Sequence, residues 1–221
     1  MERETVGKPR VQEARRRLLA ARSWRFGARG ATLVEAAIVA PLFFMLIFGV
    51  VEAGWDFFKR DAVTNMSVVG AREGAGSAND ALADYNILQA VKGASAGVSP
   101  SAIKTIVVYR ATSASDTVPS ACKTASVTNT ATTRGCNRYT GADLSLTSDQ
   151  FGCTGPPGPA VKKDSYWCPT SRKSALSGSN GPPDYIGVYV DASGASLTGV
   201  FGPILTLKSD TVMRIEPRSE T

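Results

Sequence analysis

The hydrophobic pattern of the chain is dominated by one apolar run, residues 31–51, with the sequence ATLVEAAIVAPLFFMLIFGVV. Its 21 residues contain a single charge, Glu35, and the run is apolar on all sides of a helix. At 1.5 Å per residue, a helix of this length covers about 30 Å, the thickness of the hydrocarbon core of a bilayer. A core helix of a water-soluble protein is usually shorter and apolar on one face only. The run therefore predicts a transmembrane helix over residues 31–51.

Directly after the run, the pattern changes to the three- and four-residue spacing of an amphipathic helix. The recurring apolar residues are Trp55, Phe58, Ala62, Met66 and Val69, and the polar residues between them include Asp56, Lys59, Arg60 and Asp61. We expect the same helix to continue over residues 52–78, with its first aromatic side chains at the membrane interface. Glycines at 70, 74 and 76 favour the end of this helix, because glycine is a poor helix former. Gly70 and Gly74 also have the spacing of a helix-dimer motif, but outside the apolar run we interpret them as a frayed helix end.

Residues 79–221 predict a small α+β domain. Asn79 is a candidate N-cap for a second helix over residues 80–94. The expected buried side of that helix is formed by Leu82, Tyr85, Leu88 and Val91. Segments rich in β-branched residues predict strands at 103–110, 185–190 and 211–216, with a candidate fourth strand at 204–208. The predicted fold class is thus α+β: a long N-terminal helix, half transmembrane and half amphipathic, packed on a small antiparallel sheet.

The positive charge of the chain is confined to its start. Residues 1–30 carry nine lysines and arginines against three acids, which accounts for the whole net charge of +6. A basic segment before an apolar helix is retained in the cytoplasm. We therefore expect a cytoplasmic leader (1–30), a single pass through a bacterial inner membrane and an exported head (79–221). Because the arginines adjoin the span, we do not interpret them as a nucleic-acid-binding arm.

A secretory signal peptide, cleaved before Gly54, is an alternative interpretation of residues 1–53. The apolar run is longer than the usual signal-peptide core of about 7–15 residues and contains a charge, so we favour the anchor.

Residues 111–183 are rich in Ser, Thr, Gly and Pro and predict a long loop insertion in the head. The four cysteines of the chain all lie in it: Cys122, Cys136, Cys153 and Cys168. An even number of cysteines confined to the exported half predicts two disulfides. Three pairings are possible, and we expect the sequential one because it closes the shortest loops. The cysteines include no C-x-x-C pair and the chain has no histidine, so we predict no metal site.

Two short motifs resemble catalytic signatures. Residues 93–97 (GASAG) fit G-x-S-x-G, but the chain contains no histidine for a triad. Residues 101–104 (SAIK) fit S-x-x-K, but the companion motifs of that enzyme class are missing from the sequence. Nucleotide-binding and zinc-protease fingerprints are missing as well. We therefore expect no enzyme activity, no cofactor and no small-molecule substrate.

Glu35 needs an explanation of its own, because a charge near the centre of a bilayer costs about 2.5–3.5 kcal/mol on insertion scales. It lies only five residues into the apolar run. Its position alone leaves two alternatives open: the carboxylate reaches the cytoplasmic headgroups, or it has a partner inside the membrane.

A family resemblance bears on this choice. The segment Arg29–Glu35, RGATLVE, resembles the processing site of type IV pilin-like proteins, in which a basic leader ends in glycine. The longer stretch from residue 29 to residue 75 resembles the TadE-like family of tight-adherence (Flp) pilus pseudopilins. The matching features are Arg29-Gly30, Leu33-Val34-Glu35, Pro41, Gly49, Glu52, Gly54 and Ala71-Arg72-Glu73-Gly74-Ala75. Residues 184–217 are similar to the ending of that family.

The resemblance implies that a prepilin peptidase cleaves between Gly30 and Ala31, which places Glu35 at the fifth position of the mature chain. The new amino group of Ala31 would then pair with Glu35 of a neighbouring subunit, so that each buried charge offsets the desolvation of the other. The implied partners are the inner membrane, prepilin peptidase and other pilin or pseudopilin subunits. The function implied is that of a minor pseudopilin or assembly subunit. The alternative is an exported binding domain that shares this type of anchor and contacts a ligand through residues 111–183.

Overall fold

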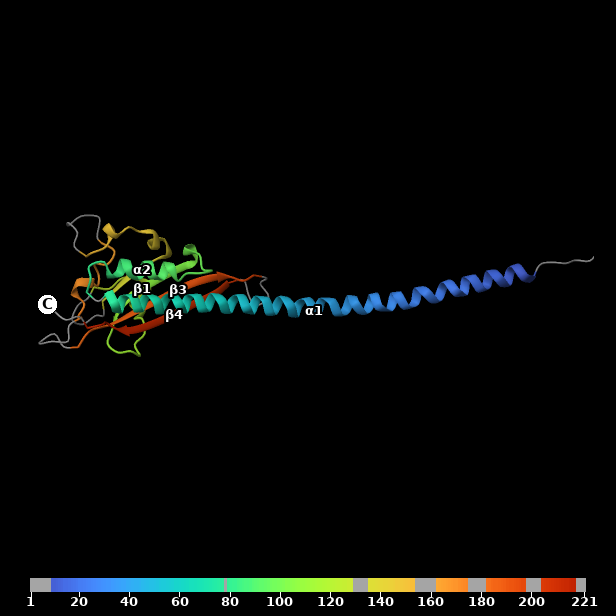
Figure 1. The fold of residues 1–221 in the computed structure, drawn as a ribbon, viewed down its shortest axis with the longest axis horizontal. Coiled ribbons are helices and arrows are strands. Elements are labelled where there is room, and N and C mark those ends of the chain that lie inside the picture. Colours follow the sequence, from blue (N-terminus) through green and yellow to red (C-terminus); the bar gives the residue numbers. More distant parts are fainter. Residues whose placement is uncertain are drawn as a thin grey trace, which may run out of the picture. The chain divides into compact units, whose positions relative to one another are not determined.

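A computed structural model describes residues 9–77, 79–128, 135–153, 162–174, 182–197 and 204–217. Helix α1 runs from Pro9 to Ser77 and continues through Pro41 without interruption (Figure 1). The chain divides into two compact units within this helix, Met1–Val51 and Glu52–Thr221. The second unit holds the end of α1 and all the other helices and strands of the described residues. We call it the head.

The head contains a four-stranded antiparallel sheet in the order β2-β1-β3-β4. The strands are β1 (Ile103–Ala111), β2 (Cys136–Tyr139), β3 (Tyr185–Ala195) and β4 (Ile204–Arg214). The α+β prediction is therefore confirmed, with two differences. The segments expected as separate strands at 204–208 and 211–216 form the single strand β4, and the short strand β2 lies inside the predicted loop insertion.

The remaining elements of the head are short. They are α2 (Ala83–Gly93), α3 (Ser120–Thr124) and four 3₁₀ turns, η1 (Pro100–Ala102), η2 (Gly141–Ser145), η3 (Ser148–Gln150) and η4 (Pro169–Ser171). Helix α2 begins later than expected, and Asn79 is not its N-cap. The residue before the helix is Leu82, whose backbone N–H donates to Asp80 Oδ1 at 2.9 Å.

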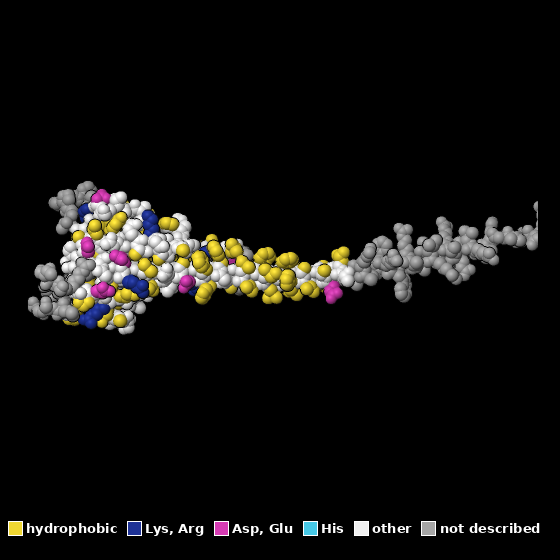
Figure 2. Space-filling view, viewed as in Figure 1, with side chains coloured by type: hydrophobic (Ala, Val, Ile, Leu, Met, Phe, Trp, Pro, Cys, Tyr) yellow, Lys and Arg dark blue, Asp and Glu magenta, His cyan; other side chains and the backbone are white. Residues whose placement is uncertain are grey.

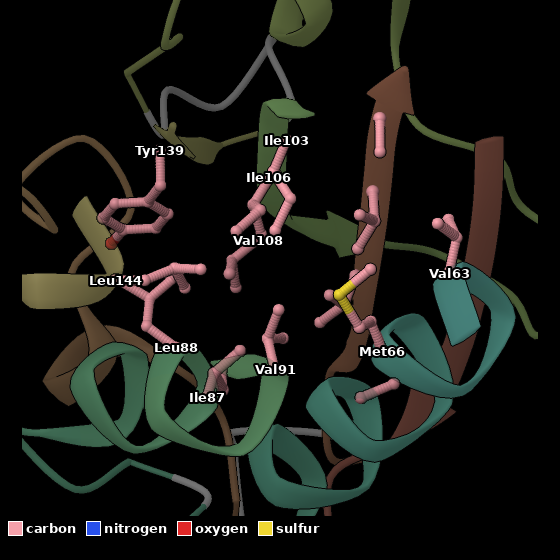
Figure 3. Close-up of a cluster of buried hydrophobic side chains, with 14 of the residues drawn as sticks. Val63, Met66, Ile87, Leu88, Val91, Ile103, Ile106, Val108, Tyr139 and Leu144 are labelled. Atoms are coloured by element: carbon pink, nitrogen blue, oxygen red, sulfur yellow. The ribbon is translucent and has the colours of Figure 1, made fainter. Parts of the chain in front are cut away.

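The main core lies where α1 and α2 pack on one face of the sheet. Met66 of α1 and Ile87, Leu88 and Val91 of α2 belong to one buried cluster with Ile106 and Val108 of β1, which lie above α2 (Figure 3). Leu88 and Val91 are buried as expected, and Ile87 joins them although the sequence analysis did not include it. Side chains alternate along β1, so Ile106 and Val108 face the helices while Val107 and Tyr109 face the opposite side of the sheet. Both sets are buried, which explains why the strand is apolar on both faces.

Gly70 and Gly74 are contact points of this core, which corrects their interpretation as a frayed helix end. A Cβ built on Gly70 would lie 2.9 Å from Val91 Cγ2, and one built on Gly74 would lie 2.8 Å from Ile186 Cδ1. Both glycines are buried and α1 continues beyond them to Ser77. Their missing side chains let α1 approach α2 and β3 closely, and this packing outweighs the poor helix propensity of glycine.

The opposite face of the sheet is covered by a smaller cluster that includes Tyr109, Val118 and Tyr189. A disulfide between Cys122 of α3 and Cys136 of β2 joins this cover to the sheet, and a second disulfide joins Cys153 to Cys168. This is the sequential pairing that the sequence analysis expects. Each bond closes a loop of about 15 residues, which in the chain-entropy view stabilises the fold by about 3 kcal/mol.

The start of η2 gives a first testable prediction. A Cβ on Gly141 would lie 1.8 Å from the carbonyl oxygen of Pro100, a backbone atom that cannot move aside as a side chain can. We therefore expect Gly141→Ala to lower the free energy of unfolding by at least about 1–3 kcal/mol, as overpacking does. Urea unfolding followed by tryptophan fluorescence measures the loss. Gly93→Ala at the end of α2 is the matched control, because no atom lies within 4 Å of its Cβ position; an equal effect of both changes would contradict the packing argument.

Candidate functional site: the apolar anchor and a buried ionic cluster

The apolar run of α1 has no buried face in the described part of the chain. Every Leu, Val, Ile, Phe and Met side chain from Leu33 to Val51 is exposed, from 41% for Ile47 to 73% for Val50. Figure 2 shows hydrophobic side chains along this segment. Among the described residues, Thr32–Ser77 of α1 is the helix segment long and apolar enough to cross a membrane, and its most apolar window, with a mean hydropathy of 2.4, is 0% buried. An exposed apolar surface of this extent is typical of a helix that lipid or neighbouring helices cover.

The residues predicted to be processed and to direct assembly lie at the start of this segment. Gly30, Ala31 and Glu35 are all inside the continuous helix α1. Gly30 has no atom within 4 Å of its Cβ position, and Glu35 is exposed. In the part of the chain that the structure describes, Glu35 makes no ion pair. These residues belong to the first unit of the chain, whereas the cysteines all lie in the second, the head.

The first turns of α1 in the head carry buried charges that the sequence analysis missed. Glu52 is 0% exposed and accepts a hydrogen bond from the hydroxyl of Ser196, while Lys59 is 8% exposed and donates to the carbonyl oxygen of Ala195 at 2.6 Å. Lys59 was expected on the polar face of the amphipathic helix, and this expectation is wrong. The two charges are seven residues apart, which places them on one side of the helix, against the end of the β3–β4 hairpin.

The apolar side of this helix divides into an exposed and a buried part. Trp55 and Phe58, which the sequence analysis expects at the membrane interface, are 41% and 45% exposed, whereas Ala62 and Met66 are buried. The Lys59 Nζ atom lies 5.4 Å from the centre of the Trp55 ring, within the range of a cation–π contact. The packed face of α1 is therefore polar at its beginning and apolar only from Ala62 onward.

A second set of buried charges ties the loop insertion to α2. The carboxylate of Asp84 accepts hydrogen bonds from Asn137 Nδ2 at 2.7 Å, from the Tyr139 hydroxyl at 2.6 Å and from Arg172 Nη2 at 2.5 Å. The side chains of Asp84 and Arg172 are both 0% exposed. We call Asp84, Asn137, Tyr139, Trp167 and Arg172 the ionic cluster. It joins α2, β2 and the segment around the Cys153–Cys168 disulfide at a single carboxylate.

Trp167 completes the cluster. Its backbone N–H donates to Asn137 Oδ1 at 2.8 Å, and the Arg172 guanidinium stacks 4.2 Å from the centre of its ring. Within the described residues, Nε and Nη1 of Arg172 and Nε1 of Trp167 have no hydrogen-bond partner. The stacking contact and the ion pair with Asp84 thus carry most of the compensation for burying this cation.

The protonation of the cluster fits this structural role. Burial, reinforced by the Asp84 carboxylate, raises the pKa of Tyr139 well above its usual value, so its hydroxyl keeps the proton that it donates. Burial also raises the pKa of nearby Asp164, although the backbone N–H groups of Gly152 and Cys153 that donate to its carboxylate counteract the rise. Three donors of the ionic cluster point at the carboxylate of Asp84. The cluster therefore holds α2, β2 and the segment around Arg172 together.

One sequence signal did point to this cluster. Asp84 stands three and four residues before Ile87 and Leu88, so it falls on the buried side of α2. A charge at such a position requires a buried partner. Nothing in the sequence identifies that partner as Arg172, which is 88 residues away in a segment rich in Ser, Pro and Gly.

Comparison with known proteins adds a match over the anchor. Residues 30–72 match the family described as TadE-like protein. The comparisons with curated proteins and with solved structures gave no match. The match begins at the predicted processing site and extends over the apolar run into the part of α1 that packs in the head. The segment that is similar to the TadE-like family therefore carries both the apolar run and the first half of the core-packing helix.

Proposed function

We propose that this chain is a minor pseudopilin or assembly subunit of a bacterial tight-adherence pilus. Residues 31–51 span the inner membrane once, the leader stays in the cytoplasm and the head is exported. The observation that carries the proposal is the coincidence of two features in one segment: residues 33–51 expose apolar side chains on every side, and the TadE-like match covers the same residues. The proposal assigns the chain no catalytic step, in keeping with a family associated with pili.

The disulfides support the proposed topology. Both lie in the head, and disulfides form and persist in oxidising compartments such as the bacterial periplasm. The basic leader supports the same orientation, because a segment with an excess of arginine and lysine beside a transmembrane helix stays in the cytoplasm.

The proposal includes cleavage between Gly30 and Ala31 by a prepilin peptidase. This bond lies inside helix α1, and a protease must unwind a helix locally to reach the backbone. Glycine lowers the cost of unwinding by about 1 kcal/mol relative to alanine. Gly30 is exposed, which is compatible with access of an enzyme to this bond.

The extent of the match supports one alternative function. Residues 73–221, which include most of the head, lie outside the family match. A binding domain carried on a TadE-type anchor, with residues 111–183 facing a ligand, is therefore the second candidate. The two candidates differ in whether the chain is processed and assembled.

The mature N-terminus tests the proposal. We expect the chain, purified from cells that contain a prepilin peptidase, to begin at Ala31 by intact-mass and N-terminal peptide analysis. Gly30→Leu is expected to abolish the cleavage, because the small residue before the scissile bond is lost. Gly27→Leu, a matched change within the leader, is expected to leave the cleavage intact. A purified chain that begins at Met1 would contradict processing, and one that begins at Gly54 would support the signal-peptide alternative.

A further inference from the structure

We propose that the head makes a second contact with the membrane through the end of its β3–β4 hairpin. The contact surface consists of Trp55, Phe57 and Phe58 of α1 and Leu197 and Ile204 of the hairpin, and we call it the basal patch. The occupant is the headgroup layer of the bilayer that holds residues 33–51. The inference rests on the part of the proposed function that places those residues in a membrane.

The distribution of exposed apolar side chains is the first observation. In the head, the described large hydrophobic residues that remain exposed are Trp55 at 41%, Phe57 at 72%, Phe58 at 45%, Tyr166 at 42%, Leu197 at 59% and Ile204 at 69%. Five of these six form the basal patch, and Tyr166 lies elsewhere, next to Trp167 of the ionic cluster. The rings of Trp55 and Phe58 are stacked with their centres 5.9 Å apart, and exposed apolar side chains of this size mark a contact with another surface.

Polar contacts hold the hairpin beside the first turns of α1 in the head. Ser196 donates its hydroxyl hydrogen to Glu52, and Lys59 donates to the carbonyl oxygen of Ala195. Ala195 is paired with Ile204 across the two strands, so both arms of the hairpin end at this position. Trp55 and Lys59 also line, together with Gly194 and Ala195, a cavity of about 230 Å³. The two parts of the basal patch therefore belong to one packed region.

The position of Glu52 in the chain sets the depth of that region. It follows Val51, the last residue of the apolar run, and the two are consecutive residues of one helix. At about 1.5 Å per residue, Trp55 lies roughly 6 Å and Phe58 roughly 10 Å beyond the end of the run along helix α1. The interfacial layer on each side of the hydrocarbon core is about 5–8 Å thick, so Trp55 falls within it and Phe58 at its outer edge. Leu197 is the residue after Ser196, whose hydroxyl contacts Glu52, so Leu197 belongs to the part of the hairpin beside the first turn of α1 in the head.

The chemistry of the patch fits a lipid interface better than a protein partner. Tryptophan and other aromatic side chains concentrate at membrane interfaces, because they combine an apolar body with a capacity for polar contact. Lys59 is buried beside Trp55, with its ammonium group on the carbonyl oxygen of Ala195 and 5.4 Å from the centre of the Trp55 ring, so it links the aromatic part of the patch to the hairpin. The basal patch would thus hold the head against the bilayer at a second point beside the transmembrane helix.

Quenching of tryptophan fluorescence by brominated lipids tests the inference. The full chain is reconstituted in nanodiscs of phosphatidylcholine and phosphatidylglycerol with bromine near the glycerol backbone. Trp24 is replaced by Phe throughout, and Trp167, which is 0% exposed, gives a constant background. Trp55 is read in one variant; in the others Trp55→Phe is combined with Leu197→Trp, Ile204→Trp or Tyr166→Trp. These three positions are exposed, so the substitutions leave the packing of the head intact.

We expect the bromolipid to quench the Leu197→Trp and Ile204→Trp signals by the same fraction as the Trp55 signal, and to leave the Tyr166→Trp signal at the background level. If Trp55 is quenched but the two hairpin tryptophans match Tyr166→Trp, the hairpin contact is wrong and the membrane anchor stands. If Trp55 is not quenched either, both the anchor and the contact are wrong. Quenching of all four signals to the same extent would also overturn the inference, because the lipid would then approach the head without preference.

Discussion

Replacing Asp84 by alanine is expected to lower the free energy of unfolding of the head by about 3–5 kcal/mol, the usual cost of removing one partner of a buried ion pair. The substitution leaves the Arg172 guanidinium without its counter-charge in a site where both side chains are 0% exposed. It also removes the acceptor of the hydrogen bonds from Asn137 and Tyr139. Urea unfolding of the full chain in detergent micelles, followed by the fluorescence of buried Trp167 with both disulfides intact, measures the loss.

Three further variants separate the possible causes of this loss. Tyr139→Phe removes one donor but no charge, so we expect a cost of about 0.5–1.5 kcal/mol. Asp84→Leu combined with Arg172→Met removes both charges, and we expect the double variant to be more stable than Asp84→Ala because no charge stays buried without a partner. Asp80→Ala is the matched control in the same segment, since the Asp80 carboxylate is exposed and bonds only the N–H of Leu82. A loss for Asp84→Ala no larger than for Asp80→Ala would contradict the assigned role of the cluster.

The anchor and the main strands could be predicted from the sequence because their signals are local. Residues 31–51 are apolar apart from Thr32 and Glu35, and the segments within β1 and β3 are rich in Val, Ile and Tyr. Strand β2 has no such signal. Its sequence, CNRY, becomes a strand because Asn137 and Arg138 pair with Val108 and Val107, about 30 residues earlier in the chain. Pairing between distant segments, not local propensity, creates this element.

The same distinction explains the errors on α1. Helix propensity predicts that Gly70 and Gly74 weaken a helix, and it carries no information on the close approach of α2 and β3 that makes them favourable. Lys59 was assigned to the polar face because lysine is usually exposed. Its burial depends on the carbonyl oxygen of Ala195, which the β3–β4 hairpin brings from 136 residues away. Within the head, the sequence therefore predicted which elements form better than it predicted which residues they bury.

Replacing Glu35 by glutamine is expected to abolish assembly into pili while leaving membrane insertion intact. Glutamine keeps the size of the side chain and its helix propensity but loses the charge. Insertion should be unaffected or slightly favoured, because the chain no longer places a carboxylate among apolar side chains. Assembly should fail, because the amino group of Ala31 created by cleavage would lose the carboxylate that neutralises it on the neighbouring subunit. Membrane fractionation and immunoblotting of sheared pili measure the two outcomes separately.

A matched control distinguishes a role of this position from a general effect of removing an acid. Asp61 lies on the same helix, exposed and outside the apolar run, so Asp61→Asn should leave both insertion and assembly unchanged. The exposure of Glu35 agrees with a partner supplied by another subunit, since the described residues of its own chain offer no ion pair. If the Glu35→Gln variant assembles into normal pili, assembly does not need the Glu35 carboxylate of the wild-type chain. That carboxylate would then only contact headgroups, and the anchor would act as a membrane tether only.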